Sequence, residues 1–250
     1  MPGLLGYDRL GGIQYFNGVA QHLSQVFSDR VCVREAKTLP LGSIEGRAKF
    51  LATQIDEFFP KGDVHLVAHS MGGLDARRLV TEKALGLYKR VRSIVTIGTP
   101  HLGSPIATTV NAFNLLRMNI GWTAGASLLD MLRQNFNAIH DLSGAAAKIF
   151  NDACADLDHV YYLEIVGVGR AGGTPTALLL KPTYQRVLAL EGPNDGVVSA
   201  VSAQRKGRTH WVWQADHVDM IGHDLNGPLP STRPAFPFLS KYEEIVKALP

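Results

Sequence analysis

Hydrophobic and polar positions follow two alternating patterns along the first hundred residues. Short runs rich in β-branched residues are typical of buried strands, and longer runs with apolar residues at helical spacing are typical of amphipathic helices. In chain order the expected elements are a strand at 31–33, a helix at 43–59, a strand at 63–68, a helix at 72–85 and a strand at 91–97. Strands that alternate with helices in this way predict a parallel sheet covered by helices.

The pattern changes after Ser104. Residues 105–158 are apolar and helix-prone and carry no strand signal, which predicts a helical insertion above the sheet. The alternation then returns, and the expected elements are a strand at 160–168, a glycine-rich turn followed by a helix, a strand around 211–213 and a helix at 239–249. Because no repeat, low-complexity tract or linker divides the chain, we expect residues 1–250 to form one α/β domain.

Composition narrows the classes of function. With 46% hydrophobic and 19% charged residues, the 250-residue chain can bury a sizeable core, so intrinsic disorder is excluded. The formal charge of +3 arises from scattered basic residues, so a nucleic-acid partner is not expected. The longest apolar runs are far shorter than the roughly 18 residues of a membrane-spanning helix. Cys32 and Cys154 lack CxxC spacing, which leaves either one disulfide or two buried thiols.

A candidate nucleophile lies between a predicted strand and a predicted helix, where residues 68–73 read Ala-His-Ser-Met-Gly-Gly. Small residues two positions before and after Ser70 let strand and helix approach closely, and a serine on such a tight turn exposes its hydroxyl at the carboxyl end of the sheet. Ala68 replaces the first glycine of the usual G-x-S-x-G pattern and adds one methyl group. The alternative is that the Ser70 hydroxyl only caps the following helix.

A serine nucleophile needs a histidine base oriented by a carboxylate, and after this type of turn the order along the chain is Ser, acid, His. His217 lies just past the last predicted strand, on the side where Ser70 emerges, and is preferred over His223. Asp195 lies 22 residues before His217 in an Asn-Asp-Gly turn and would hold the imidazole in one tautomer. A surface-loop histidine and an ordinary turn aspartate are the alternatives.

Six motifs of the chain, taken in order, carry a family resemblance. They are Gly-Leu-Leu-Gly at 3–6, Tyr-Phe-Asn-Gly-Val at 15–19, the serine turn at 68–73, Gly-Thr-Pro-His-Leu-Gly-Ser at 98–104, Asn-Asp-Gly-Val-Val at 194–198 and Asp-His-Val-Asp at 216–219. With these motifs the sequence resembles the bacterial triacylglycerol lipases of the true-lipase group, within the α/β-hydrolases.

The resemblance implies an α/β-hydrolase fold with a triad of Ser70, Asp195 and His217. It implies that the N–H groups of Leu4 and Met71 are the oxyanion donors. The implied reaction is hydrolysis of carboxylic esters, typically acylglycerols, through an acyl-enzyme and without a cofactor. The expected partner is then a lipid or ester substrate, with contact to a lipid–water interface.

Residues 105–134 occupy the place of the family's lid. Their apolar content suits a wall that binds an acyl chain, and the residues expected to line the substrate site are Ile106, Val110, Phe113 and Leu116. An ordinary packed helical cap is the alternative, because apolar periodicity does not distinguish a moving lid from a fixed one.

The start of the chain departs from the family's pattern. Family members begin with a strand that leads into the oxyanion glycine, but this sequence starts at Met1-Pro2-Gly3, so that strand is expected to be missing. Its absence would open a gap of about 10 Å in the sheet, unless the neighbouring strands close up or the sequence begins late. The absence of a signal peptide therefore leaves the localisation open.

A second departure concerns structural calcium. The resemblance implies a Ca²⁺ held by an aspartate before a Pro-Thr pair and by an aspartate just after the catalytic histidine. Asp219 matches the second position, but Lys181 stands at the first, and an ammonium group would repel the ion. We therefore expect no metal. Lys181 either forms an ion pair with Asp219 or is a solvated surface residue.

Two other functions are compatible with the same residues. An acyltransferase would differ from a hydrolase only in the nucleophile that reaches the acyl-enzyme, and the sequence does not separate the two. A catalytically inactive hydrolase fold used for binding is disfavoured, because all three residue types of the triad occur in the expected order.

Overall fold

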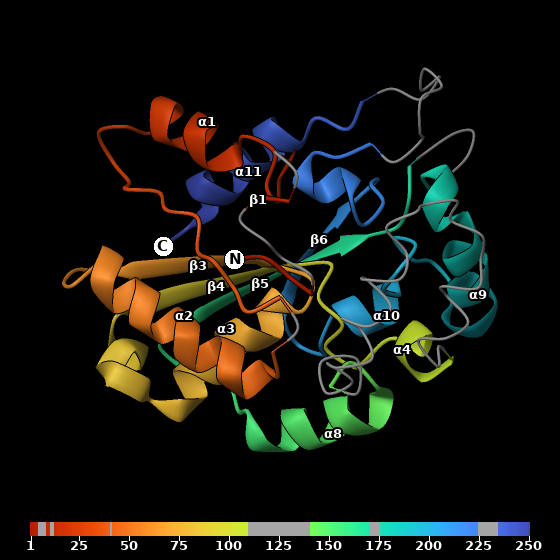
Figure 1. Cartoon of the computed structure of the whole chain (residues 1–250), viewed down its shortest axis with the longest axis horizontal. Helices are drawn as coiled ribbons and strands as arrows, with labels where there is room; N and C mark the ends of the chain where they lie inside the picture. Colours follow the sequence, from red (N-terminus) through yellow and green to blue (C-terminus); the bar gives the residue numbers. More distant parts are fainter. Residues whose placement is uncertain (5–8, 11–12, 41, 110–140, 171–175, 225–234) are drawn as a thin grey trace.

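The computed structural model describes residues 1–4, 9–10, 13–40, 42–109, 141–170, 176–224 and 235–250 (Figure 1). Its centre is a parallel sheet of four strands in the order β3-β4-β5-β6. The strands are β3 (Val64–His69), β4 (Val91–Ile97), β5 (Tyr161–Gly167) and β6 (Thr209–Trp213). Strand β4 is buried at every position but one, as expected for a central parallel strand covered on both faces.

Helices cover both faces of this sheet, and Figure 1 shows α1 (Val19–Val26) and α11 (Phe238–Ala248) on one side and α2 (Ile44–Phe58) and α3 (Gly72–Glu82) on the other. Side chains of β4 alternate between the two faces. Ile94 packs in the cluster with α2 and α3, whereas Val95 and Ile97 pack in the cluster with α1 and α11. This alternation gives the sheet a hydrophobic layer on each side.

The remaining elements are short or lie outside the sheet. They are β1 (Arg9–Leu10), β2 (Ile13–Gln14), η1 (Ala84–Lys89), α4 (Pro105–Thr109), α8 (Gly144–Ala153), η2 (Leu178–Leu180), α9 (Lys181–Glu191), α10 (Ala200–Ala203) and η3 (Asp219–Ile221). Of the predicted insertion at 105–158, residues 110–140 lie outside the described residues. The insertion and the single-domain organisation therefore stay predictions.

Most predicted elements are present, and the fold is the predicted α/β arrangement of a parallel sheet flanked by helices. Ser43 caps α2 as expected, because its side chain accepts the backbone N–H of Gly46. The predicted strand at 31–33 is wrong, since these residues are not in a strand and pair with no strand among the described residues. Helix α1 was not predicted, because it starts at left-handed Gly18 without a capping side chain.

The first residues of the chain lie against the end of β3. The ammonium of Met1 donates to the carbonyl of Val67 at 2.8 Å, and the N–H of His69 donates to the carbonyl of Met1 at 3.0 Å. Beside them a groove of about 420 Å³ runs between residues 31–35 and β3.

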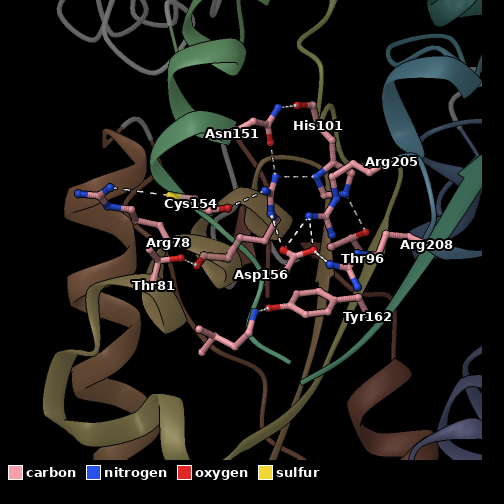
Figure 2. Close-up of polar contacts among 12 residues, drawn as sticks. Arg78, Thr81, Thr96, His101, Asn151, Cys154, Asp156, Tyr162, Arg205 and Arg208 are labelled. Carbon is pink, nitrogen blue, oxygen red and sulfur yellow. Dashed lines mark hydrogen bonds and ion pairs between the residues drawn. The ribbon is translucent and has the colours of Figure 1, made fainter. Parts of the chain in front are cut away.

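A buried ionic network joins β5 to the segments around it (Figure 2). Arg205 donates to Glu164 of β5 at 2.6 Å and to Asp156 at 2.7 and 2.8 Å. Arg77 of α3 donates to Asn151 of α8 at 2.7 Å and approaches the ring of His101 at 3.3 Å. These contacts tie α3, α8 and the loop that carries His101 to the sheet.

Both cysteines are free thiols. Cys154 is buried beside this network, whereas Cys32 is exposed, so the alternative of two buried thiols is wrong for Cys32. Among the described residues, no helix combines the length and apolar character that a membrane span requires.

Candidate active site

Ser70 lies on the sharp turn between β3 and α3. Its φ of 55° is in the left-handed region, which a residue with a side chain rarely adopts, and its N–H donates to the carbonyl of Ile97 at 2.8 Å. A Cβ on Gly72, two residues after Ser70, would lie 2.6 Å from the carbonyl oxygen of Pro2, so this position of the motif needs a glycine. Helix α3 receives no hydrogen bond from a capping side chain at its start, so the capping alternative for Ser70 gains no support.

Asp195 and His217 form a buried pair. The Nδ1 of His217 lies 2.7 Å from Oδ2 of Asp195, and the side chains are 10% and 1% exposed. The other carboxylate oxygen accepts the N–H groups of Val197 and Val198 at 2.9 and 2.7 Å. The backbone N–H of His217 also donates to the carbonyl of Asp195 at 2.8 Å. The carboxylate is therefore held in place, and it fixes the tautomer in which Nδ1 carries the proton.

The end of β4 brings this pair and the serine to the same edge of the sheet. A Cβ on Gly98 would lie 2.9 Å from Oδ2 of Asp195 and 3.2 Å from Nδ1 of His217. The ring of His69, the neighbour of Ser70, lies 4.4 Å from the ring of His217 between centroids. The hydrogen bonds of the described residues do not include one between Ser70 and His217.

His223, the alternative base, and His101 each contact other groups. The Nε2 of His223 lies 2.9 Å from the carbonyl of Gln14 and 3.0 Å from that of Tyr15. His101 is fully buried, and its burial, together with Arg77, keeps its pKa well below the usual range. The Nε2 of His101 lies 3.7 Å from Oε1 of Glu164, a longer contact than the 2.7 Å between His217 and Asp195.

The described start of the expected oxyanion loop lies against Ser70. A Cβ on Gly3 would come within 2.6 Å of the Ser70 Cβ, so only glycine fits there. Leu4 packs against the hydrophobic cluster of Ile44, Met71 and Leu74, in which Met71 is fully buried. The two residues expected to supply the oxyanion donors therefore meet at one hydrophobic cluster.

Arg47 of α2 holds this loop, and the sequence analysis missed it. It is fully buried and donates to the carbonyls of Pro2 and Gly3, both at 3.0 Å, and to Asp75 at 2.9 Å. Burial raises the pKa of Asp75 to about 7, and Arg47 opposes this shift. The signal was present, because Arg47 falls among the apolar positions of a helix whose other charges face water.

In the loop around His217, Asp219 pairs with Arg170 and not with Lys181. Arg170 donates through Nε to Asp219 at 2.6 Å and through Nη2 to the other carboxylate oxygen. Asp219 is 2% exposed and also accepts the N–H of Asp216 at 3.1 Å. Lys181 is exposed at the start of α9, so the Lys181–Asp219 pair is not formed and Arg170 takes its place.

The remaining predictions of the sequence analysis concern a metal site and the residues that line the substrate site. Within the described part of the chain, no group of three or more His, Cys, Asp or Glu side chains could hold a metal ion. Ile106 is half-buried in α4 beside the acid loop, where Ser104 donates to the carbonyl of Val197 at 2.8 Å. The other expected substrate residues, Val110, Phe113 and Leu116, lie outside the described residues.

The fold and the site together define the class of the protein. A parallel sheet with helices on both faces, and a serine on the strained turn after one of its strands, is the α/β-hydrolase arrangement. Residues 43–167 match the model of the family described as the PGAP1-like alpha/beta domain. This match covers half of the chain.

Comparison with known proteins gives the particular family. The chain is 37% identical over 231 residues to triacylglycerol lipase 2 of Saccharomyces cerevisiae, covering 86% of this chain and 64% of the yeast protein. It is 32% identical over 248 residues to a triacylglycerol lipase of Vibrio cholerae, covering 88% of this chain and 77% of that protein. The chain belongs to the triacylglycerol lipase family of the α/β-hydrolases.

Solved structures show the same fold. Lipase 1 from Pelosinus fermentans superposes with a TM-score of 0.73 at 18% identity, and the match covers 100% of this chain and 98% of that one. The similarity is therefore one of architecture along the whole chain.

Proposed function

We propose that the chain is a serine hydrolase that cleaves carboxylic esters of acylglycerols or related lipids. The observation that carries the proposal is the buried Asp195–His217 pair, joined at 2.7 Å and placed at the same sheet edge as the strained turn of Ser70. The yeast and Vibrio relatives are named as triacylglycerol lipases, which supports this substrate class.

In the proposed reaction the Ser70 oxygen attacks the ester carbonyl while His217 Nε2 takes the hydroxyl proton. Asp195 stabilises the imidazolium that forms, because it already accepts the hydrogen bond from Nδ1. The N–H groups of Leu4 and Met71 stabilise the oxyanion. His217 then returns its proton to the departing alcohol, which leaves an acyl group on Ser70.

Deacylation repeats the same steps with water. His217 removes a proton from water, the resulting hydroxide attacks the acyl carbonyl, and Ser70 leaves with the proton that His217 carries. The fatty acid is released and the site is restored. If an acceptor alcohol reached the acyl-enzyme instead of water, the same residues would perform acyl transfer.

We further expect the segment 105–134 to contact the acyl chain, with Ile106, Val110, Phe113 and Leu116 as the wall and with a lipid–water interface nearby. Deleting this segment should then impair long-chain esters more than short ones, because a chain contact is lost only where a chain reaches it. Equal loss for short and long p-nitrophenyl esters would contradict this role.

The central experiment separates an enzyme from an inactive scaffold. A fluorophosphonate probe should label the wild-type protein at Ser70, and Ser70→Ala should remove the label while leaving the melting temperature close to that of the wild type. Turnover of p-nitrophenyl esters should fall to background in the same variant. Absence of both labelling and turnover in the wild-type protein would refute the proposed hydrolase. Product analysis with added alcohol distinguishes hydrolysis from acyl transfer.

A further inference from the structure

A chain of three hydrogen bonds links the oxyanion loop to the backbone of His217. The Tyr15 hydroxyl lies 2.9 Å from the N–H of Gly3 and 2.8 Å from Nδ1 of His69. On the far side of the imidazole, Nε2 of His69 lies 2.9 Å from the carbonyl oxygen of His217. This series of hydrogen bonds starts one residue before Leu4 and ends on the expected base. Its two side chains, Tyr15 and His69, belong to neither the triad nor the oxyanion donors.

Only one arrangement of protons satisfies all three contacts. The His217 carbonyl can only accept, so Nε2 of His69 must carry a proton. Burial and the neighbouring His217 keep the pKa of His69 well below its usual range, so the ring is neutral and Nδ1 is an acceptor. Burial raises the pKa of Tyr15, so its hydroxyl keeps the proton that it donates to Nδ1. The same oxygen then accepts the N–H of Gly3.

We propose that Tyr15 and His69 are positioning residues that set the oxyanion loop and the His217 backbone relative to each other. The inference rests on the proposed function, since it assigns a role within that active site. Gly3 and His217 are more than two hundred residues apart in the sequence and lie on different loops. Because hydrogen bonds are directional, the three bonds that join the two loops fix the position of one loop relative to the other.

The geometry of the ends explains why catalysis should depend on this chain. Gly3 lies so close to Ser70 that a Cβ would come within 2.6 Å of the serine Cβ, so a shift of the loop moves the oxyanion donors relative to the nucleophile. The imidazoles of His69 and His217 lie 4.4 Å apart between centroids, so a shift of His69 reaches the base directly. Misplacement by about 1 Å in such a site costs up to about 100-fold in rate.

Three variants each remove different hydrogen bonds of this series. Tyr15→Phe removes the hydroxyl and leaves the Gly3 N–H and His69 Nδ1 without it. In His69→Gln the amide N–H can reach the position of Nε2 and keep the bond to His217, and in His69→Asn the amide oxygen can reach the position of Nδ1 and keep the bond to Tyr15. Each His69 variant therefore preserves one end of the chain and releases the other.

Matched controls break the same types of hydrogen bond elsewhere in the sheet. His65→Gln alters a histidine of β3 whose Nδ1 pairs with the hydroxyl of Ser93 at 2.8 Å. Tyr162→Phe removes a hydroxyl that accepts the N–H of Leu157 at 3.0 Å, away from Ser70. Both controls measure the effect of losing a histidine–hydroxyl or tyrosine–backbone bond on folding alone.

The measurement is kcat and KM for a p-nitrophenyl ester, with thermal unfolding of every variant. We expect Tyr15→Phe to lower kcat about 10- to 100-fold with KM within about twofold. Misaligned loops weaken the stabilisation of the transition state more than the binding of the substrate. His69→Gln and His69→Asn should each fall between Tyr15→Phe and the wild type. The fold-loss of kcat in the double variant Tyr15→Phe/His69→Asn should be smaller than the product of the fold-losses in the two single variants, because both changes break the same series of hydrogen bonds. The control variants should retain the wild-type kcat.

Two outcomes would overturn the positioning role. One is a kcat for Tyr15→Phe within about twofold of the wild type at equal folding; the other is a loss matched by the control variants with the same fall in melting temperature. The failure of the proposed function is a separate result. In that case the wild-type protein itself would neither turn over the ester nor react with fluorophosphonate, and the positioning role would fall with it.

Discussion

The Arg170–Asp219 ion pair offers a test of how the His217 loop is stabilised. The two side chains are 8% and 0% exposed, and Arg170 contacts both carboxylate oxygens, so the pair is buried and bidentate. In Arg170→Met the new side chain is apolar and of similar length. Asp219 then keeps the N–H of Asp216 but loses its cation. The variant therefore leaves a carboxylate without its counter-charge inside the protein.

The expected cost is large because the pair is buried. Breaking a buried ion pair by removing one partner costs about 3–5 kcal/mol, whereas an exposed pair contributes about 0–1 kcal/mol. For a chain of this size each kcal/mol corresponds to about 2–4 °C, so the melting temperature should fall by about 6–20 °C. Lys148→Met is the control, because Lys148 and Asp152 are joined at 2.7 Å but are 77% and 66% exposed.

The assay combines urea unfolding, thermal unfolding and ester turnover at neutral pH. Arg170→Met/Asp219→Asn should recover part of the lost stability, because the carboxylate that Arg170 contacted is then replaced by a neutral amide. Because Asp219 lies two residues after His217, we also expect kcat to fall in Arg170→Met. A loss of stability no larger than that of Lys148→Met would refute the argument, and so would a double variant less stable than Arg170→Met.

Three further predictions concern the site and its surroundings. Ser70→Ala and His217→Ala should each lower the rate by several orders of magnitude and nearly equally, because members of a triad act as a unit, whereas His223→Ala should be mild; the reverse pattern would show that the base is misassigned. A chelator should leave activity and melting temperature unchanged, and a large loss of stability in EDTA would contradict this. Stability should fall as the pH drops below about 6.5, because His69 and His101 have pKa values lowered by burial, so the unfolded chain binds protons there that the folded chain does not, and these two groups outweigh Asp75, whose raised pKa acts in the opposite direction. A free energy of unfolding that is constant between pH 7.5 and 5 would contradict that reasoning.

Local patterns of the sequence determined the main elements and the order of the candidate residues. The strand at 91–97 was predicted with its observed bounds, because a β-branched run ending at Gly-Thr-Pro carries its own start and stop signals. Asp195 and His217 were selected from turn chemistry and chain order, and their side chains are joined at 2.7 Å in the structure. These features depend on residues close together in sequence or on a fixed topological order.

The partners that hold the site were decided by the tertiary structure. Asp219 could have met Lys181 or another cation, and only the folded chain shows that Arg170, 49 residues away, reaches both of its carboxylate oxygens. The bond from His69 to the backbone of His217 spans 148 residues and depends on how two loops meet. The run at 31–33 has strand composition, but within the part of the chain that the structure describes it pairs with no strand. In each case the deciding contact lies between segments distant in sequence, and local propensity carries no information about which distant groups will satisfy a buried charge or a strand edge.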